Sequence, residues 1–271
     1  MIDTKEQIIK YFKSGIKDKK AMISTIHHLN LAHGLAVSEI RKIVPEGKIG
    51  IVISMQPVVD WDKEPICSSL LDILFNRAHT DPLFLGSYPE LILEEISPFV
   101  KNDDMQIIKQ RLDFFGLNHY TTMRARSLPG TTLGLDIVKP SPEIKQTIKG
   151  WEINPEMFYQ QLVELKNRYG NPPIYVTENG CACMDEINSK GKILDVDRIE
   201  YFRDYLFAAK KAIDDGVNLK GYFAWTLLDN FEWDCGFTER FGLVHVDFNT
   251  LRRSPKESFY FLKNVFKKNH I

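Results

Sequence analysis

Two segments of this 271-residue sequence end an apolar run in carboxylates, amides and aromatic residues. In the first, the β-branched stretch 174–177 leads directly into Glu178 and stops at Gly180. In the second, 225–233, an apolar stretch leads to Glu232 between two tryptophans. An ionised carboxylate at the end of a buried strand is costly unless it has a partner or a chemical task. Both segments are therefore candidates for a functional site at the carboxyl ends of strands, the edge where β/α barrels build their active sites.

Buried strands alternate with helices about four times along the chain. Strands are predicted at 48–54, 113–118, 174–177 and 220–227. Helices are predicted at 21–42, 66–78, 89–96, 103–111, 155–169, 195–214 and 255–268, with a long loop at 128–150 and a hairpin at 237–248. Asn154 is expected to cap the helix that begins at Pro155. The alternation predicts parallel β/α units, and four strands are half of what a closed barrel needs.

The two segments resemble motifs of glycoside hydrolase family 1, the β-glucosidase family. Residues 177–180 (Thr-Glu-Asn-Gly) resemble its nucleophile motif, and 225–233 resemble its sugar-binding motif. Further similarity lies at 27–29, 31–34, 47–52, 81–84, 116–120, 236–243 and 247–248. The resemblance implies the (β/α)8 TIM-barrel fold, with this chain carrying strands five to eight as a half barrel. It divides the chain into a non-matching extension, 1–14, and the C-terminal half of a family barrel, 15–271.

The resemblance also implies roles for individual residues. Glu178 would be the nucleophile of a retaining β-glycosidase, and Tyr120 would orient it by a hydrogen bond. The residues expected to bind substrate are Asn118, Trp225, Glu232, Trp233 and Phe241. His119 stands where the family usually has tyrosine, and its side chain is expected to point away from its strand neighbours.

The family's second catalytic carboxylate, in an Asn-Glu-Pro motif, does not occur in the sequence. Residues 62–65 (Asp-Lys-Glu-Pro) lack the asparagine and follow a different strand. The chain therefore contains no acid/base residue, and the isolated chain is expected to be inactive or weak as a β-glucosidase. The alternatives are a non-catalytic carbohydrate-binding or complementing subunit, and a truncated gene relic.

Substrate and partners follow from charge and from the missing strands. Glu232 would repel a phosphorylated sugar at close range, so the expected ligand is a small neutral β-glycoside or oligosaccharide. In a half barrel, the strands at 48–54 and 220–227 would each have an unpaired edge. This predicts association, whether with a complementing N-terminal half, with a second copy, or as aggregates.

Composition excludes several classes of protein. The net charge of −1 favours neither nucleic acid nor an anionic membrane as partner, and no apolar stretch is long enough for a membrane span. A cytoplasmic location is expected. No cofactor or metal is expected: the histidines at 27, 28 and 33 have a poor metal spacing, and Cys181-x-Cys183 has neither a zinc nor a thioredoxin spacing. The two cysteines are interpreted as small apolar residues near a pocket.

Overall fold

The computed structural model describes residues 18–271 except 62–64, 132, 186, 190 and 234. Its main sheet contains four parallel strands in the order β1-β3-β6-β7. These are β1 (Gly50–Ser54), β3 (Phe114–Asn118), β6 (Ile174–Asn179) and β7 (Leu219–Ala224). All four predicted strands are confirmed, with β1 and β7 at the two edges of the sheet. The predicted extension, 1–14, lies outside the described residues, so its boundary stays a prediction.

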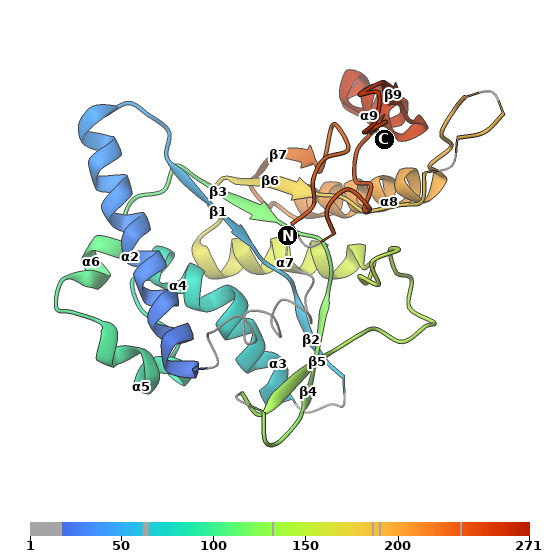
Figure 1. Ribbon diagram of the computed structural model, residues 1–271. Helices are drawn as coiled ribbons and strands as arrows, with labels where there is room; N and C mark the ends of the chain where they lie inside the picture. The colour runs from blue at the N-terminus through green and yellow to red at the C-terminus, as the bar shows by residue number, and fades with distance from the viewer. Residues whose placement is uncertain (1–17, 62–64, 132, 186, 190, 234) are drawn as a thin grey trace.

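Two long helices cover one face of this sheet (Figure 1). Helix α7 (Pro155–Tyr169) connects β3 to β6, and α8 (Val196–Asp214) connects β6 to β7. The predicted cap of α7 is confirmed, because the Asn154 side chain accepts a hydrogen bond of 3.1 Å from the Met157 amide. The helix ends at Gly170, whose φ of 73° is easily adopted only without a Cβ.

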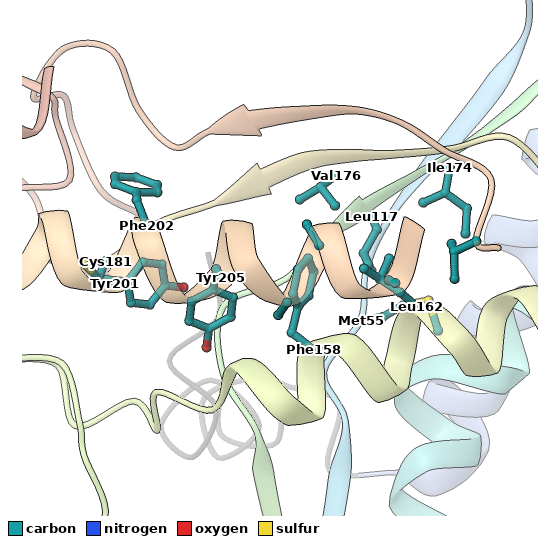
Figure 2. Close-up of a cluster of buried hydrophobic side chains, with 14 of the residues drawn as sticks. Met55, Leu117, Phe158, Leu162, Ile174, Val176, Cys181, Tyr201, Phe202 and Tyr205 are labelled. Carbon is teal, nitrogen blue, oxygen red and sulfur yellow. The ribbon is translucent and has the colours of Figure 1, made fainter. Parts of the chain in front are cut away.

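The two faces of the sheet differ in burial. Phe115, Leu117 and Val176 point toward the helices and are fully buried, in a cluster with Phe158 of α7 and other residues shown in Figure 2. On the opposite face, which is the interior side of a barrel, Val52 and Phe223 are 49% and 57% exposed. The chain thus buries the outer wall of a half barrel and leaves part of the inner wall open.

The remaining elements surround this sheet. The helices are α2 (Lys19–Ile43), α3 (Pro65–Asp72), α4 (Ala78–Phe84), α5 (Leu93–Ile96), α6 (Asp104–Ile108) and α9 (Glu257–Lys268). The short helical turns are η1 (Ile73–Arg77), η2 (Glu90–Ile92) and η3 (Ser97–Phe99). The further strands are β2 (Val58–Asp60), β4 (Met123–Ser127), β5 (Leu135–Val138), β8 (Val244–Val246) and β9 (Arg253–Pro255). None of the described helices is both long enough and apolar enough to cross a membrane.

Five predicted boundaries are wrong. The strand at 220–227 ends at Ala224, and the helix at 103–111 ends at Ile108. The helix at 66–78 continues to Phe84 through the π-helical turn η1. The loop at 128–150 contains β5, which pairs antiparallel with β4. The hairpin at 237–248 lies later in the chain, because β8 pairs with β9 across a turn in which the Asp247 carboxylate accepts the Asn249 amide at 2.9 Å. An aspartate that bonds to nearby backbone amides stabilises such a turn.

Candidate functional site

The sequence-predicted site residues meet at the carboxyl ends of β3, β6 and β7, which are neighbours in the sheet. The pairing of β3 with β6 is irregular there: Leu117 is opposite Val176, but Asn118 is opposite Glu178. Thr177 is therefore an extra residue, a bulge. Val176 faces the helices, and regular alternation would turn Glu178 to that face as well. The bulge instead re-aims the Glu178 side chain toward the interior side of the sheet.

A short hydrogen bond joins Tyr120 to Glu178. The Tyr120 hydroxyl donates a hydrogen bond of 2.5 Å to Oε2 of Glu178. Tyr120 is 3% exposed, and its backbone amide donates to Oε1 of Gln56 at 3.0 Å. Burial, and secondarily the Glu178 charge, raises the pKa of Tyr120 well above its ordinary value. The phenol therefore stays protonated and acts as a fixed donor to the carboxylate.

The segment after β7 adds a second carboxylate and an indole. Nε1 of Trp225 donates to Oε1 of Glu232 at 3.3 Å. Glu232 is 3% exposed, and burial raises the pKa of its carboxyl, while the Trp225 bond and the Lys149 ammonium oppose that shift. Gly180 explains how Trp225 comes so close to β6: a Cβ at position 180 would lie 2.0 Å from the Trp225 carbonyl oxygen. Only glycine fits this approach.

The other predicted substrate-binding residues have different environments. Oδ1 of Asn118 accepts a hydrogen bond of 2.6 Å from the Thr177 hydroxyl. Trp233 is 79% exposed, so its ring is open to a ligand. Phe241 is 1% exposed and packs against the rings of Tyr120 and Trp151. Phe241 thus packs behind Tyr120, and its expected contact with substrate stays a prediction.

His119 confirms the expected alternation along β3. Its ring is fully buried on the helix side, where it packs against Phe158 and Tyr205. Its Nδ1 lies 2.8 Å from Oε1 of Gln161. Burial lowers the pKa of His119 to about 4, so the ring is neutral near pH 7. It contributes packing on the side of the sheet opposite to Glu178.

Several residues at the site were not predicted from the sequence. Gln56 accepts a hydrogen bond from the Tyr120 backbone amide. The Trp151 ring packs on the Tyr120 ring, with 5.5 Å between the ring centroids. The Asn179 amide donates to the His119 carbonyl at 2.8 Å and to the Tyr201 hydroxyl at 2.9 Å. Asn179 could have been found from its place in the motif, because a buried amide must have partners. Lys149 comes from the irregular segment 139–154, whose sequence carries no motif.

A buried charge cluster lies beneath the segment that carries Glu232. Asp229 accepts hydrogen bonds from Nζ of Lys256 at 3.0 Å, from the Gly242 amide at 2.9 Å and from Nη1 of Arg240 at 3.2 Å. Ligand atoms of Asp185, Asp229 and His245 lie within 4.8 Å of one another, a spacing that could suit a metal. The Lys256 ammonium contacts both aspartates of that set and already supplies their cation.

Comparison with known proteins agrees with this geometry. The sequence profile of glycosyl hydrolase family 1 matches residues 3–271. Beta-glucosidase A of Acetivibrio thermocellus is 40% identical over 264 residues, which are 94% of this chain and 59% of that protein. The 1,4-beta-D-glucan glucohydrolase of Thermotoga neapolitana is 39% identical, covering 95% of this chain and 59% of its own length. The chain thus spans a little over half the length of these relatives.

Solved structures give the same result. The family 1 β-glucosidase of Thermotoga maritima superimposes with a TM-score of 0.84 and 37% identity, over 91% of this chain and 56% of that one. The same enzyme with deoxynojirimycin gives a TM-score of 0.83 and 38% identity. The expected half of a TIM barrel is confirmed. With a profile match over nearly its whole length and this fold, the chain belongs to glycosyl hydrolase family 1.

Proposed function

We propose that this chain carries the nucleophilic half of a retaining β-glycosidase active site, with Glu178 as the nucleophile. The observation that carries the proposal is the 2.5 Å hydrogen bond from the buried Tyr120 hydroxyl to Glu178. Such a bond fixes the direction of the carboxylate. Attack of Glu178 on the anomeric carbon would form a glycosyl-enzyme, which water then hydrolyses.

The expected ligand is a neutral β-glycoside or oligosaccharide. Glu232 can accept from sugar hydroxyls, and the indoles of Trp225 and Trp233 offer flat faces and N–H donors. The carboxylates of Glu178 and Glu232 disfavour a phosphorylated sugar, although Lys149 offsets part of this charge. The Thermotoga maritima relative binds deoxynojirimycin, a sugar-like inhibitor, which supports the same ligand class.

The acid/base carboxyl would come from a complementing segment that carries the other strands of a family barrel. General acid–base help is worth about 10²–10⁴-fold in rate. We therefore expect the chain alone to hydrolyse an ordinary aryl β-glucoside negligibly. The predicted cytoplasmic location of the protein stays a prediction.

The nucleophile can be tested without the missing carboxyl. A dinitrophenyl glucoside needs no proton on its leaving group, and fluorine beside the anomeric carbon slows release of the sugar from the enzyme. Incubation of the chain with such a fluoroglucoside should add one fluoroglucosyl group to the protein. Peptide mass spectrometry should place it on Glu178.

The matched variant is Glu178→Gln, which keeps the shape and removes the nucleophile. It should show no adduct, while Glu143→Gln, at an exposed carboxylate, should label as the wild type does. An adduct on another residue, or none at millimolar reagent with the chain folded, would refute the proposal.

Azide adds a direct check, because it can attack a glycosyl-enzyme without base help and should restore turnover of the dinitrophenyl glucoside.

The second candidate is a carbohydrate-binding protein without catalysis. The observation that favours it is that Glu232, Trp225 and the exposed Trp233 stand together in a chain whose sequence lacks the acid/base motif. Calorimetric titration with cellobiose should then show binding that Glu232→Gln weakens, with no adduct from the fluoroglucoside. Absence of heat at high millimolar sugar would exclude this candidate.

A further inference from the structure

Cys181 and Cys183 immediately follow the Glu178-Asn179-Gly180 turn, and the proposed function uses neither of them. Their Sγ atoms lie 3.5 Å apart. Residues two apart in an extended chain share a face, which explains how the two thiols meet. Both are buried, at 2% and 6% exposure, and Cys181 is part of the cluster in Figure 2. The sequence interpretation of small apolar residues fits their burial, and the contact between their sulfur atoms adds a second feature.

The surroundings of the pair favour a thiolate on one sulfur. The fully buried guanidinium of Arg198 affects both thiols. Its charge is shared with Asp195 and Asp185, with which it forms ion pairs, and its Nε has no hydrogen-bond partner among the described residues. The hydrogen bond with Cys181, opposed by burial and assisted by Arg198, lowers the pKa of Cys183. Burial raises the pKa of Cys181. Cys183 is also the more exposed of the two, at 6% against 2%, so we assign it as the nucleophilic sulfur and Cys181 as the neighbour that resolves its oxidised form.

The pair lies close to the surface along the chain. Cys183 is 6% exposed and is followed directly by Met184, which is 72% exposed. The Cys183 sulfur is therefore the one that a small neutral oxidant would reach first.

We propose that Cys181 and Cys183 are a redox pair that hydrogen peroxide converts into a reversible disulfide. The Cys183 thiolate attacks one peroxide oxygen: an S–O bond forms, the O–O bond breaks, and hydroxide leaves and takes a proton as water. The Cys181 sulfur then attacks the Cys183 sulfur: the S–S bond forms, the S–O bond breaks, and a second water leaves with the remaining proton. Two thiols lose two electrons, and one peroxide is reduced to two waters.

Closure would displace the end of β6. The two sulfurs must approach from 3.5 Å to about 2.05 Å. The bridge would span only one intervening residue, and such constrained bridges are readily reduced by dithiols. Gly180, between the pair and Glu178, has no free space beside the Trp225 carbonyl. Oxidation should therefore disturb the sugar site, a consequence that rests on the proposed function.

Peptide mapping of the full chain tests the disulfide itself. After peroxide treatment, the protein is denatured in acid, alkylated with iodoacetamide and digested with trypsin. Both cysteines lie in the peptide 169–190, and Cys235 lies in 221–240. The expected result is a 169–190 peptide that has lost two hydrogen atoms and takes no alkyl group. Dithiothreitol should restore both thiols, which iodoacetamide then alkylates. Oxidation of Met184 adds oxygen and is distinguished by mass.

Two variants and one internal control make the outcome decisive. In Cys183→Ser, peroxide should consume Cys181 at least tenfold more slowly than it consumes the wild-type pair. In Cys181→Ser, the Cys183 sulfur should gain oxygen, and the 169–190 peptide should not show the loss of two hydrogen atoms that marks an internal disulfide. Cys235, which accepts a hydrogen bond of 3.1 Å from Lys149, reports that peroxide acted. Two alkylated thiols at 181 and 183 after Cys235 is fully oxidised would overturn the proposal.

Fluoroglucoside labelling separates the two claims. The oxidised chain should label at least tenfold more slowly than the reduced chain, and dithiothreitol should restore the rate. If the reduced chain takes no label, the proposed function fails while the peptide map still decides the disulfide. If labelling is equal in both states, the disulfide has no effect on the sugar site.

Discussion

At the scale of single residues, Tyr120 determines how Glu178 is presented. A hydrogen bond to a charged group contributes about 1.5–3 kcal/mol, and the 2.5 Å bond is the contact that Tyr120→Phe removes. We expect this variant to take the fluoroglucosyl label about ten- to a hundredfold more slowly than the wild type. Tyr260→Phe, at a residue that is 46% exposed on α9, is the matched control and should label normally. An unchanged rate in Tyr120→Phe would show that the phenol does not orient the nucleophile.

His119 makes a prediction about stability and pH. Its folded pKa is about 4, against an ordinary value of 6.5, so between these values the unfolded chain binds a proton that the folded chain does not. The free energy of unfolding therefore falls as pH falls from about 6.5 toward 4. From pH 7 to pH 5, His119→Asn should lose about 2 kcal/mol less than the wild type in urea unfolding. Equal losses would mean that His119 is protonated in the folded state.

Residue identity was easier to predict from the sequence than residue orientation. The sequence motifs reveal that Glu178, Tyr120 and Glu232 each end or follow a strand of one parallel sheet. This shared position brings the three side chains together. The bulge at Thr177, which turns Glu178 inward, depends on how β6 pairs with β3 and leaves no mark in the sequence. The burial of Phe241 depends on its packing against Trp151, which the sequence does not reveal.

At the scale of elements, Lys256 and Asp229 hold the segment between β7 and α9. Lys256, at the start of α9, is fully buried and contacts Asp185 and Asp229. Removing one partner of a buried ion pair costs about 3–5 kcal/mol, because the other charge remains unpaired. Lys256→Met should lower the free energy of unfolding by about that amount in urea denaturation. The double variant with Asp229→Asn should recover part of it.

An exposed lysine provides the control for this prediction. Lys210 pairs with Asp214 on α8, and the two side chains are 63% and 61% exposed. Surface pairs contribute about 0–1 kcal/mol, so Lys210→Met should change stability by less than 1 kcal/mol. If both variants lose the same stability, the buried cluster does not hold this segment.

Long periodic elements were predictable, and short ones were not. Helices α7 and α8 follow from apolar periodicity and a capping asparagine, and their predicted bounds agree with the structure within one residue. Strands β2 and β5 have only 3 and 4 residues, and both pair with β4. Their conformation is set by that pairing rather than by their own residues. The turn after Asp247 is formed by hydrogen bonds from the amides of residues 249 and 250 to its carboxylate, which apolar periodicity does not reveal.

At the scale of the whole molecule, the sheet has one covered face and one face that is partly open. Residues Val52 and Phe223 would be enclosed if the sheet continued into a barrel. Apolar surface of this kind, together with two sheet edges that are unpaired within the described part of the chain, favours association with another chain. The chain spans 59% of the length of its relatives, and the complementing segment that we propose would carry the strands that complete their barrel.

Without such a partner, the open face is expected to drive self-association, which sedimentation of the chain alone can test. The chain has a mass of 31.4 kDa, and at micromolar concentration we expect species above that mass. Phe223→Lys should shift the distribution toward the monomer, weakening association about tenfold or more, because burying a phenylalanine side chain is worth about 1.5–3 kcal/mol. The substitution should leave the monomer stable, since Phe223 is already 57% exposed there.

Phe207→Lys makes the same change on the outer face of α8, where phenylalanine is 51% exposed, and should leave association unchanged. A wild-type chain that sediments as a single monomeric species would show that the open face needs no partner, and equal effects of both variants would place the contact elsewhere.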